Sequence, residues 1–302
     1  MWQLYSSIGL LFGAAEETID KATMVGSKTI DLLSAAWIRN TISFGVSIVA
    51  IVVVTGTSPQ VVFSLPIIFF GILNGMSAIT YTILLKKVEI TASSIMTSFI
   101  PLVFLPIDLF IFDAHFLPRQ VFGIVILVTG GIIFFYRKAS GTPITRKQMV
   151  TLISIFLFDA LLIGFESYLF KDYFVSLHLS EMSFLVNIFG ATFLFLTILV
   201  SLRCLYVGKM PAMRIYKKYM RGSLFSKILD YGNSFFFLKA LTLASAAQVT
   251  SMKVFYPIAL LFIVIGTQKR FGVDLEEYLD HRSLVSKTLG IAIICCGAYL
   301  AR

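Results

Sequence analysis

Charged residues are scarce in this sequence of 302 residues, because Asp, Glu, Lys and Arg make up 14% of it and apolar residues make up 58%. A soluble domain of ordinary composition has about a quarter of its residues charged. The mean hydropathy is +0.90. A globule of this composition has too little polar surface to cover itself, so lipid must cover much of it. The sequence therefore predicts an all-α multi-pass membrane protein.

Residues that hold metals or form disulfides are also few, with three cysteines and three histidines in the chain. Cys295 and Cys296 are adjacent in an apolar run, and the histidines lie far apart. No CxxC, HExxH or GxSxG motif and no Walker-type phosphate loop is present. No basic region precedes the first apolar run, so a cleaved signal peptide is not expected. We expect no metal, no cofactor and no enzymatic activity.

Apolar runs with polar breaks predict ten membrane segments, since helices of roughly 20 residues span a bilayer. The segments are Trp2–Met24, Leu33–Val54, Val62–Leu85, Ala92–Phe112, Val121–Tyr136, Val150–Tyr173, Glu181–Leu202, Leu224–Leu243, Ala247–Gly266 and Leu284–Ala301. The longest polar stretch, Arg203 to Lys227, carries basic residues at helical spacing. We expect it to form a separate surface helix on the lipid headgroups, with a dedicated lipid or partner site as the alternative.

Residues 72–133 and 228–300 match as an internal repeat. At offsets of 156 and then 167, the matched pairs are Asn74 with Asp230, Pro101 with Pro257, Gly123 with Gly290 and Gly130 with Gly297. Matched Pro and Gly positions indicate matched backbone breaks and close contacts. The halves are residues 1–136 and 150–302, joined by a loop at 137–149. Because each half has an odd number of segments, five, we expect two inverted five-helix repeats, as in many transporters.

The net charge of +9 is concentrated in loops. That pattern suits an anionic membrane surface better than nucleic acid. Lys and Arg fall mainly on the loops after the odd-numbered segments. The positive-inside rule then places these loops in the cytoplasm and both termini outside. We expect an integral protein of a bacterial cytoplasmic (inner) membrane.

Four charged residues, Glu16, Glu17, Asp20 and Lys21, lie inside the first segment. Glu16 lies about 20 Å into a helix that starts near Trp2. Each charge facing lipid would cost at least ~2.5–3.5 kcal/mol. These residues must therefore pair, take up protons or face water, unless the segment is shorter and they lie at the interface. Glu16 with Asp20, and Glu17 with Lys21, share a helix face at i,i+4.

Other polar residues lie at matched or deep positions. Segment six carries Glu166 shortly after a glycine, and segment one likewise carries an acid shortly after a glycine. Lys253 lies four residues before a helix-breaking proline. Asn74 serves either a site or a structural hydrogen bond, and Arg39 either faces a cavity or snorkels to the surface. The candidate substrate-binding residues are Glu16, Glu17, Asp20, Arg39, Asn74, Tyr81, Glu166, Asp230, Asn233, Lys253 and Tyr256.

The chain resembles the drug/metabolite transporter (DMT) superfamily, specifically its ten-helix EamA-type members. The resemblance rests on the ends of the two halves: a small-residue run, Phe-x-Pro at 99–101 and 255–257, then a helix with Gly123/Gly130 or Gly290/Gly297. Arg39 is similar to the family's second-helix arginine. The resemblance implies a central substrate cavity, rocking helices and no ATP hydrolysis. It also implies cytoplasmic termini, opposite to the charge pattern.

These observations predict a secondary transporter for a small polar metabolite. Acids and bases at one depth favour a zwitterionic or mixed-charge substrate: an amino acid, a nucleoside derivative or an S-adenosylmethionine-like compound. The expected partners are this substrate, the bilayer, and protons or an exchanged metabolite, with no nucleic acid; the chain is expected to be a monomer or homodimer. The alternative is a membrane-embedded enzyme or lipid-handling protein, which would need a nucleophile–base pair or a metal cluster.

Overall fold

A computed structural model of the chain describes residues 1–26, 30–60, 62, 64–87, 118–119, 121–123, 125–126, 129–130, 150–151, 154–155, 157–159, 161–162, 179–207, 213–243, 249, 252–273, 275 and 281–301. Every element in these ranges is helical. The α-helices are α1 (Trp2–Val25), α2 (Leu32–Thr55), α3 (Leu65–Lys87), α8 (Glu181–Val207), α9 (Met213–Leu243), α11 (Tyr256–Phe271) and α12 (His281–Ala301), and a 3₁₀ turn, η1 (Met252–Phe255), precedes α11. The prediction of an all-α chain is confirmed for these residues.

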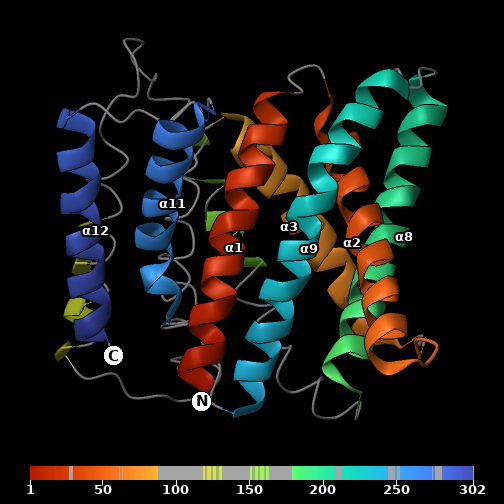
Figure 1. The fold of residues 1–302 in the computed structure, drawn as a ribbon, viewed down its shortest axis with the longest axis horizontal. Helices are drawn as coiled ribbons and strands as arrows, with labels where there is room; N and C mark the ends of the chain where they lie inside the picture. Colours follow the sequence, from red (N-terminus) through yellow and green to blue (C-terminus); the bar gives the residue numbers. More distant parts are fainter. Residues whose placement is uncertain are drawn as a thin grey trace.

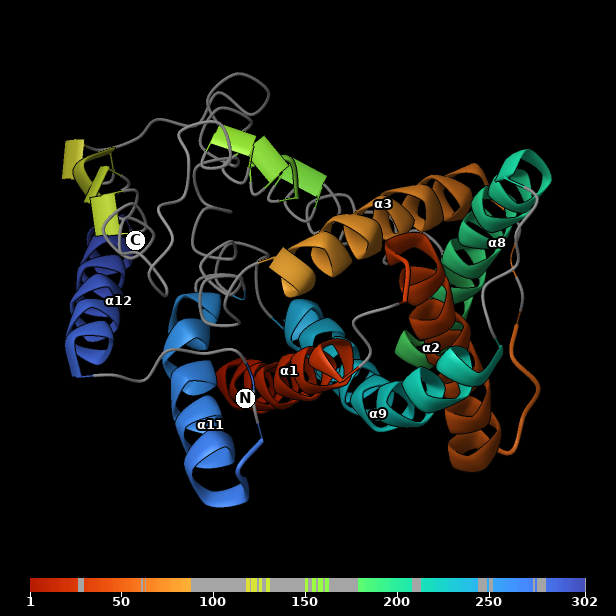
Figure 2. The same ribbon diagram turned by 90° about the horizontal axis from the view of Figure 1, so that it is seen from above.

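The helices form a bundle in which α3 lies obliquely across the others (Figures 1 and 2). The start of α1 and the end of α12 lie at the same end of the bundle (Figure 1). By length and composition, three described helices can cross a membrane: Leu32–Thr55, Leu65–Lys87 and Glu181–Tyr206. Helix α2 packs against both α8 and α9, and α3 packs against α8.

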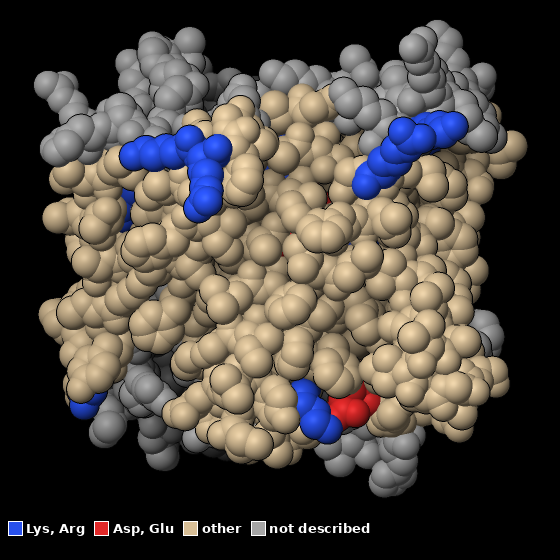
Figure 3. Space-filling model, in the orientation of Figure 1, with Lys and Arg blue, Asp and Glu red and all other residues tan. Residues whose placement is uncertain are grey.

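The surface of the bundle has the pattern that a bilayer favours. On the face in Figure 3, Lys and Arg lie near the two edges, and the band between them is almost free of charged side chains. Large apolar side chains such as Val53, Ile198 and Phe262 are exposed on the helices. Exposed apolar surface of this extent needs a covering partner. The three apolar helices make the hydrocarbon of a membrane the natural partner.

Predicted segments one, two, three, seven and ten agree with described helices to within a few residues. Segments four, five and six lie largely outside the described residues. The expectation of a separate surface helix at Arg203 to Lys227 is wrong, because its second part is the start of α9. Helix α9 runs unbroken for 31 residues, about 46 Å at 1.5 Å per residue. Segment nine is also shorter as an α-helix than predicted, because α11 begins at Tyr256 with Pro257 in its first turn.

The start of α2 is fixed by a side-chain cap. Asp31 accepts a hydrogen bond from the backbone N–H of Ser34 at 3.0 Å and forms an ion pair with Arg203 at the end of α8. Partial burial raises the pKa of Asp31, but the hydrogen bonds from Ser34 and the Arg203 charge outweigh it, so the pKa lies below its ordinary value. Asp31 therefore anchors α2 to α8 at one end of the bundle.

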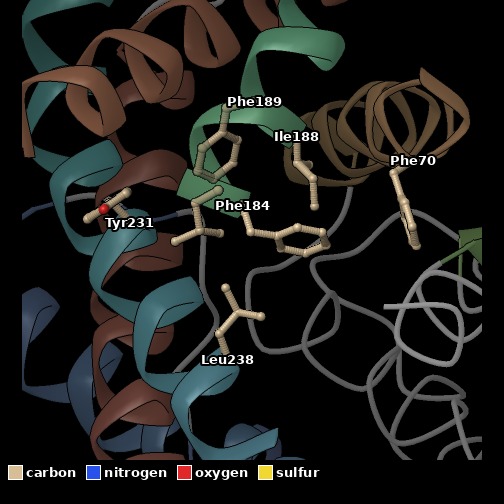
Figure 4. Packing of buried hydrophobic residues seen from close by; sticks show 7 residues of the cluster. Phe70, Phe184, Ile188, Phe189, Tyr231 and Leu238 are labelled. Carbon is tan, nitrogen blue, oxygen red and sulfur yellow. The ribbon is translucent and has the colours of Figure 1, made fainter. Parts of the chain in front are cut away.

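Aromatic packing and a close helix contact hold α8 against α3 and α9. Phe70 on α3 lies near Phe184 of α8, and their cluster extends to Tyr231 and Leu238 of α9 (Figure 4). The rings of Phe70 and Phe184 meet edge to face at 6.4 Å. A Cβ on Gly71 would lie 2.4 Å from that of Ala191 on α8. The Gly71/Gly75 pair thus allows close helix approach, as its spacing predicts.

Candidate functional site

The charged residues of α1 lie in the interior of the bundle. Glu16, Glu17, Asp20 and Lys21 are all less than 9% exposed. All four lie within α1, which ends at Val25, and the bundle buries them rather than leaving them at its surface. Helix α1 packs against α9, α11 and α3. The helices around α1 supply partners for these charges.

Arg39 of α2 lies between the two acids that share a face of α1. Its Nη2 forms an ion pair with Asp20 and lies 3.4 Å from Oε1 of Glu16. Its guanidinium carbon lies 4.7 Å from the centre of the Tyr81 ring on α3, a cation–π contact. The side chain is buried, so Arg39 does not snorkel to the surface. Its Nε has no hydrogen-bond partner among the described residues.

Lys227 of α9 joins three carboxylates. Its Nζ lies 2.6 Å from Oε1 of Glu16, 3.0 Å from Oδ2 of Asp230 and 3.5 Å from Oδ2 of Asp20. The hydroxyl of Ser226 donates to Oδ1 of Asp20 at 2.7 Å. Three donors thus hold Asp20, while Lys227 bridges Glu16 and Asp230. We name Glu16, Asp20, Arg39, Lys227 and Asp230 the charge network.

Further side chains beside the charge network contact α1 from α9 and α11, and Lys21 of α1 contacts α3. The hydroxyl of Tyr256 donates to Oε2 of Glu17 at 2.7 Å. A Cβ on Gly13 would lie 3.0 Å from Nδ2 of Asn233 and 3.2 Å from a ring carbon of Tyr256. Only glycine leaves both side chains this close to the helix backbone. Lys21 donates to the carbonyl of Leu85 at the end of α3, at 2.8 Å.

The charge network is buried, but solvent reaches part of it. The Asp230 side chain is 22% exposed and that of Glu16 is 11% exposed, against 1% for Asp20. Asp230 also accepts a hydrogen bond from Ser43 of α2 at 3.3 Å. With Glu17 and Lys21, the buried cluster has four acidic and three basic side chains among the described residues. A bound proton or another cation is the group that would balance the extra acid.

The structure brings together most of the candidate residues. Around α1 it places Glu16, Glu17, Asp20, Arg39, Tyr81, Asp230, Asn233 and Tyr256. Asn74 instead donates to the Thr192 hydroxyl of α8 at 3.0 Å, a structural bond between helices. Glu166 lies outside the described residues, and so does the side chain of Lys253, of which the structure describes the backbone in η1.

The sequence reasoning did not identify three charged residues as buried: Lys227, Asp159 and Lys287. Lys227 lies where the predicted polar stretch overlaps segment eight, and its i,i+3 spacing to Asp230 was a signal of a pair on one helix face. Asp159 lies in segment six, and its buried carboxylate accepts hydrogen bonds from Ser77 at 3.1 Å and from Thr80, both on α3.

Comparison with known proteins assigns no family. No family model matches the chain, and no curated protein matches it. Among solved structures, a chain titled "Crystal structure of protein" superposes with a TM-score of 0.64 at 12% identity, covering 99% of this chain and 95% of that chain. At this identity the similarity shows a shared fold along nearly the whole length, and it says nothing of function.

Proposed function

We propose that the chain is a secondary transporter that moves a small zwitterionic or mixed-charge metabolite by alternating access between two inverted five-helix halves. The observation that carries this proposal is the charge network, a buried cluster of three acidic and two basic side chains at the centre of a membrane bundle. Buried charges are expensive and rarely add stability over apolar packing. Ionisable residues inside a membrane bundle commonly mark a substrate or ion pathway.

The network offers a place for each end of such a substrate. Asp230 is its most exposed carboxylate and would bind an ammonium or sulfonium group. Nε of Arg39 is a buried donor with no described acceptor, so it would bind a substrate carboxylate. Tyr81 and Tyr256 add aromatic faces or hydroxyls beside these charges. Amino acids, nucleoside derivatives and S-adenosylmethionine-like compounds fit this pattern.

Helix contacts support the proposal of inverted halves. Exchanging the halves would carry α2 onto α8 and α3 onto α9. The α2–α8 contact would then map onto itself, and the α2–α9 contact would map onto the contact between α8 and α3. The structure contains the α2–α8, α2–α9 and α3–α8 contacts, as this symmetry requires. Segment five would map onto segment ten, and Gly130 packs against Ile293 of α12. The common end of α1 and α12 fits an even number of crossings such as ten (Figure 1).

Transport is tested with purified protein in liposomes. Thermal-shift screening against amino acids, nucleosides and S-adenosylmethionine selects the probe, and uptake of the radiolabelled probe is then measured. We expect Asp230→Asn and Glu17→Gln to reduce uptake. Glu181→Gln is the matched control, because Glu181 pairs with Lys239 at the end of the bundle, at 2.9 Å. Uptake that both site variants leave unchanged would refute the proposal, and conversion of the probe to a product would favour the enzyme alternative.

A further inference from the structure

Among the described residues, Asp159 is a buried acid that the proposed substrate site does not use. Its residue is 1% exposed. Its Oδ1 accepts the hydroxyl hydrogens of Ser77 and Thr80, and its Oδ2 has no hydrogen-bond partner among the described residues. The acids of the charge network differ, because each has a Lys or Arg partner.

The surroundings of Asp159 favour its neutral form. No charged side chain among the described residues forms an ion pair with it. The titratable groups of α3, the helix packed against it, are Tyr81, Lys86 and Lys87. Tyr81 faces Arg39, and Lys86 donates to the carbonyl of Ile30 at 3.0 Å. An isolated buried carboxylate takes up a proton because the charged form loses its hydration without gaining a counter-charge.

A metal ion fits the same atoms less well. It would need several oxygen lone pairs directed at one point. Here the hydroxyls of Ser77 and Thr80 both contact Oδ1 of Asp159, and Oδ2 has no hydrogen-bond partner among the described residues. The Thr80 hydroxyl also lies 2.9 Å from the carbonyl of Ser77, so its one hydrogen is shared between two acceptors. The arrangement therefore suits a carboxyl that gains and loses a proton.

Helix α3 connects Asp159 to the charge network. Thr80 contacts Asp159, and the next residue, Tyr81, lies against Arg39. Successive residues of an α-helix point about 100° apart, so one turn of α3 faces both groups. A shift of this helix would change the hydroxyl contacts of Asp159 and the aromatic contact of Arg39 together.

From this geometry we propose that Asp159 is the proton-carrying group of the chain and that α3 couples its protonation to the charge network. The carboxylate takes a proton from water on one side of the membrane and holds it as a neutral carboxyl while α3 moves. It then releases the same proton to water on the other side. This proposal rests on the proposed transport function and names its coupling ion.

Infrared spectroscopy tests the proton independently of any substrate. The wild-type protein in lipid at neutral pH is expected to show a protonated-carboxyl band that shifts in deuterated water. Asp159→Asn should reduce the band by the contribution of one carboxyl, seen in the wild-type-minus-variant difference spectrum, because Asn keeps the acceptor for Ser77 and Thr80 but binds no proton. Glu181→Gln, which changes an ion-paired acid at the end of the bundle, should leave the band unchanged. Absence of the band from the wild type, or an Asp159→Asn band equal to that of the wild type, would overturn the proposal.

Liposome transport of radiolabelled S-adenosylmethionine tests the coupling. With one proton per substrate, a pH gradient of one unit drives about a tenfold concentration ratio, because both correspond to the same free energy. Asp159→Asn should lose this gradient-driven accumulation in whichever direction the wild type shows it, and should keep exchange of labelled for unlabelled probe. Asp159→Glu should restore part of the accumulation.

The outcomes separate the two proposals. If Asp159→Asn loses both exchange and accumulation, Asp159 serves substrate binding or structure, and the proposed coupling is overturned. Accumulation equal to that of the wild type also overturns it. If the wild type carries neither this probe nor those selected by thermal shift, the proposed function fails, and the infrared result alone decides whether Asp159 carries a proton.

Discussion

Removal of the Lys227 ammonium is the sharpest test of the charge network. Lys227→Met keeps most of the side-chain volume and the helix propensity of α9 but deletes the cation between Glu16 and Asp230. Asp20 keeps Arg39 and the Ser226 hydroxyl. Removing one partner of a buried ion pair costs about 3–5 kcal/mol, because the other charge stays buried without compensation.

The expected loss is measurable by thermal unfolding in detergent at a fixed scan rate, since such unfolding is often irreversible. At about 2–4 °C per kcal/mol for a large domain, Lys227→Met should lower the Tm by about 6–20 °C. The matched control is Lys217→Met, the same change at an exposed position of α9, which should change stability by about 0.5 kcal/mol or less.

A double variant distinguishes an unpaired charge from a packing defect. Adding Asp230→Asn to Lys227→Met removes one of the carboxylates left without a cation, so the Tm should recover in part. A packing defect at Lys227 would give no recovery. Equal Tm values for Lys227→Met and Lys217→Met would refute the reasoning altogether, because Lys227 would then contribute nothing through its three carboxylate contacts.

Two further predictions concern the helix framework. Gly71→Ala would place a Cβ against the backbone of α8 and should lower stability by about 1–3 kcal/mol. The control is Gly45→Ala, whose Cβ meets no atom within 4 Å and which should stabilise α2. Similar Tm shifts for the two variants would contradict the close contact between α3 and α8. The pKa of Asp31 is lowered in the folded chain, so its contribution is present above the unfolded pKa of about 3.9 and is lost as pH falls through the folded pKa. Asp31→Asn keeps the cap without titrating, so its Tm should lie below that of the wild type at pH 6 and approach it in acid, and a constant difference would exclude the linkage.

The sequence predicted helix positions well where apolar runs coincide with helix ends. Asp31 caps α2 beside the predicted start at Leu33, because a polar break supplies both the cap and the end of the lipid-facing run. The prediction failed at α9. Hydropathy indicates apolar surface, and the basic residues at the start of α9, such as Lys217, are compatible with helix. The helix therefore continues past its apolar part.

The sequence predicted which charged residues lie deep in the bundle, but it did not predict which side chains contact one another. Glu16 and Asp20 were assigned to one face, and both contact Arg39. Asn74 was paired with Asp230 by repeat position, and each bonds to a hydroxyl of a neighbouring helix: Asn74 to Thr192 of α8 and Asp230 to Ser43 of α2. Asp230 also pairs with Lys227, a contact that the repeat position did not predict.

The contacts of Lys227 explain how the proposed site binds and releases a cation without leaving a buried charge unpaired. It contacts Glu16 more closely than Asp230, at 2.6 Å against 3.0 Å. A substrate ammonium at the exposed edge of Asp230 would replace that weaker contact, while Lys227 keeps Glu16. Coulomb gain and desolvation cost nearly balance in buried pairs, so this exchange changes the free energy little in either direction. A site with such a balance can load on one side of a membrane and unload on the other, whereas an acid held by one unexchangeable partner cannot.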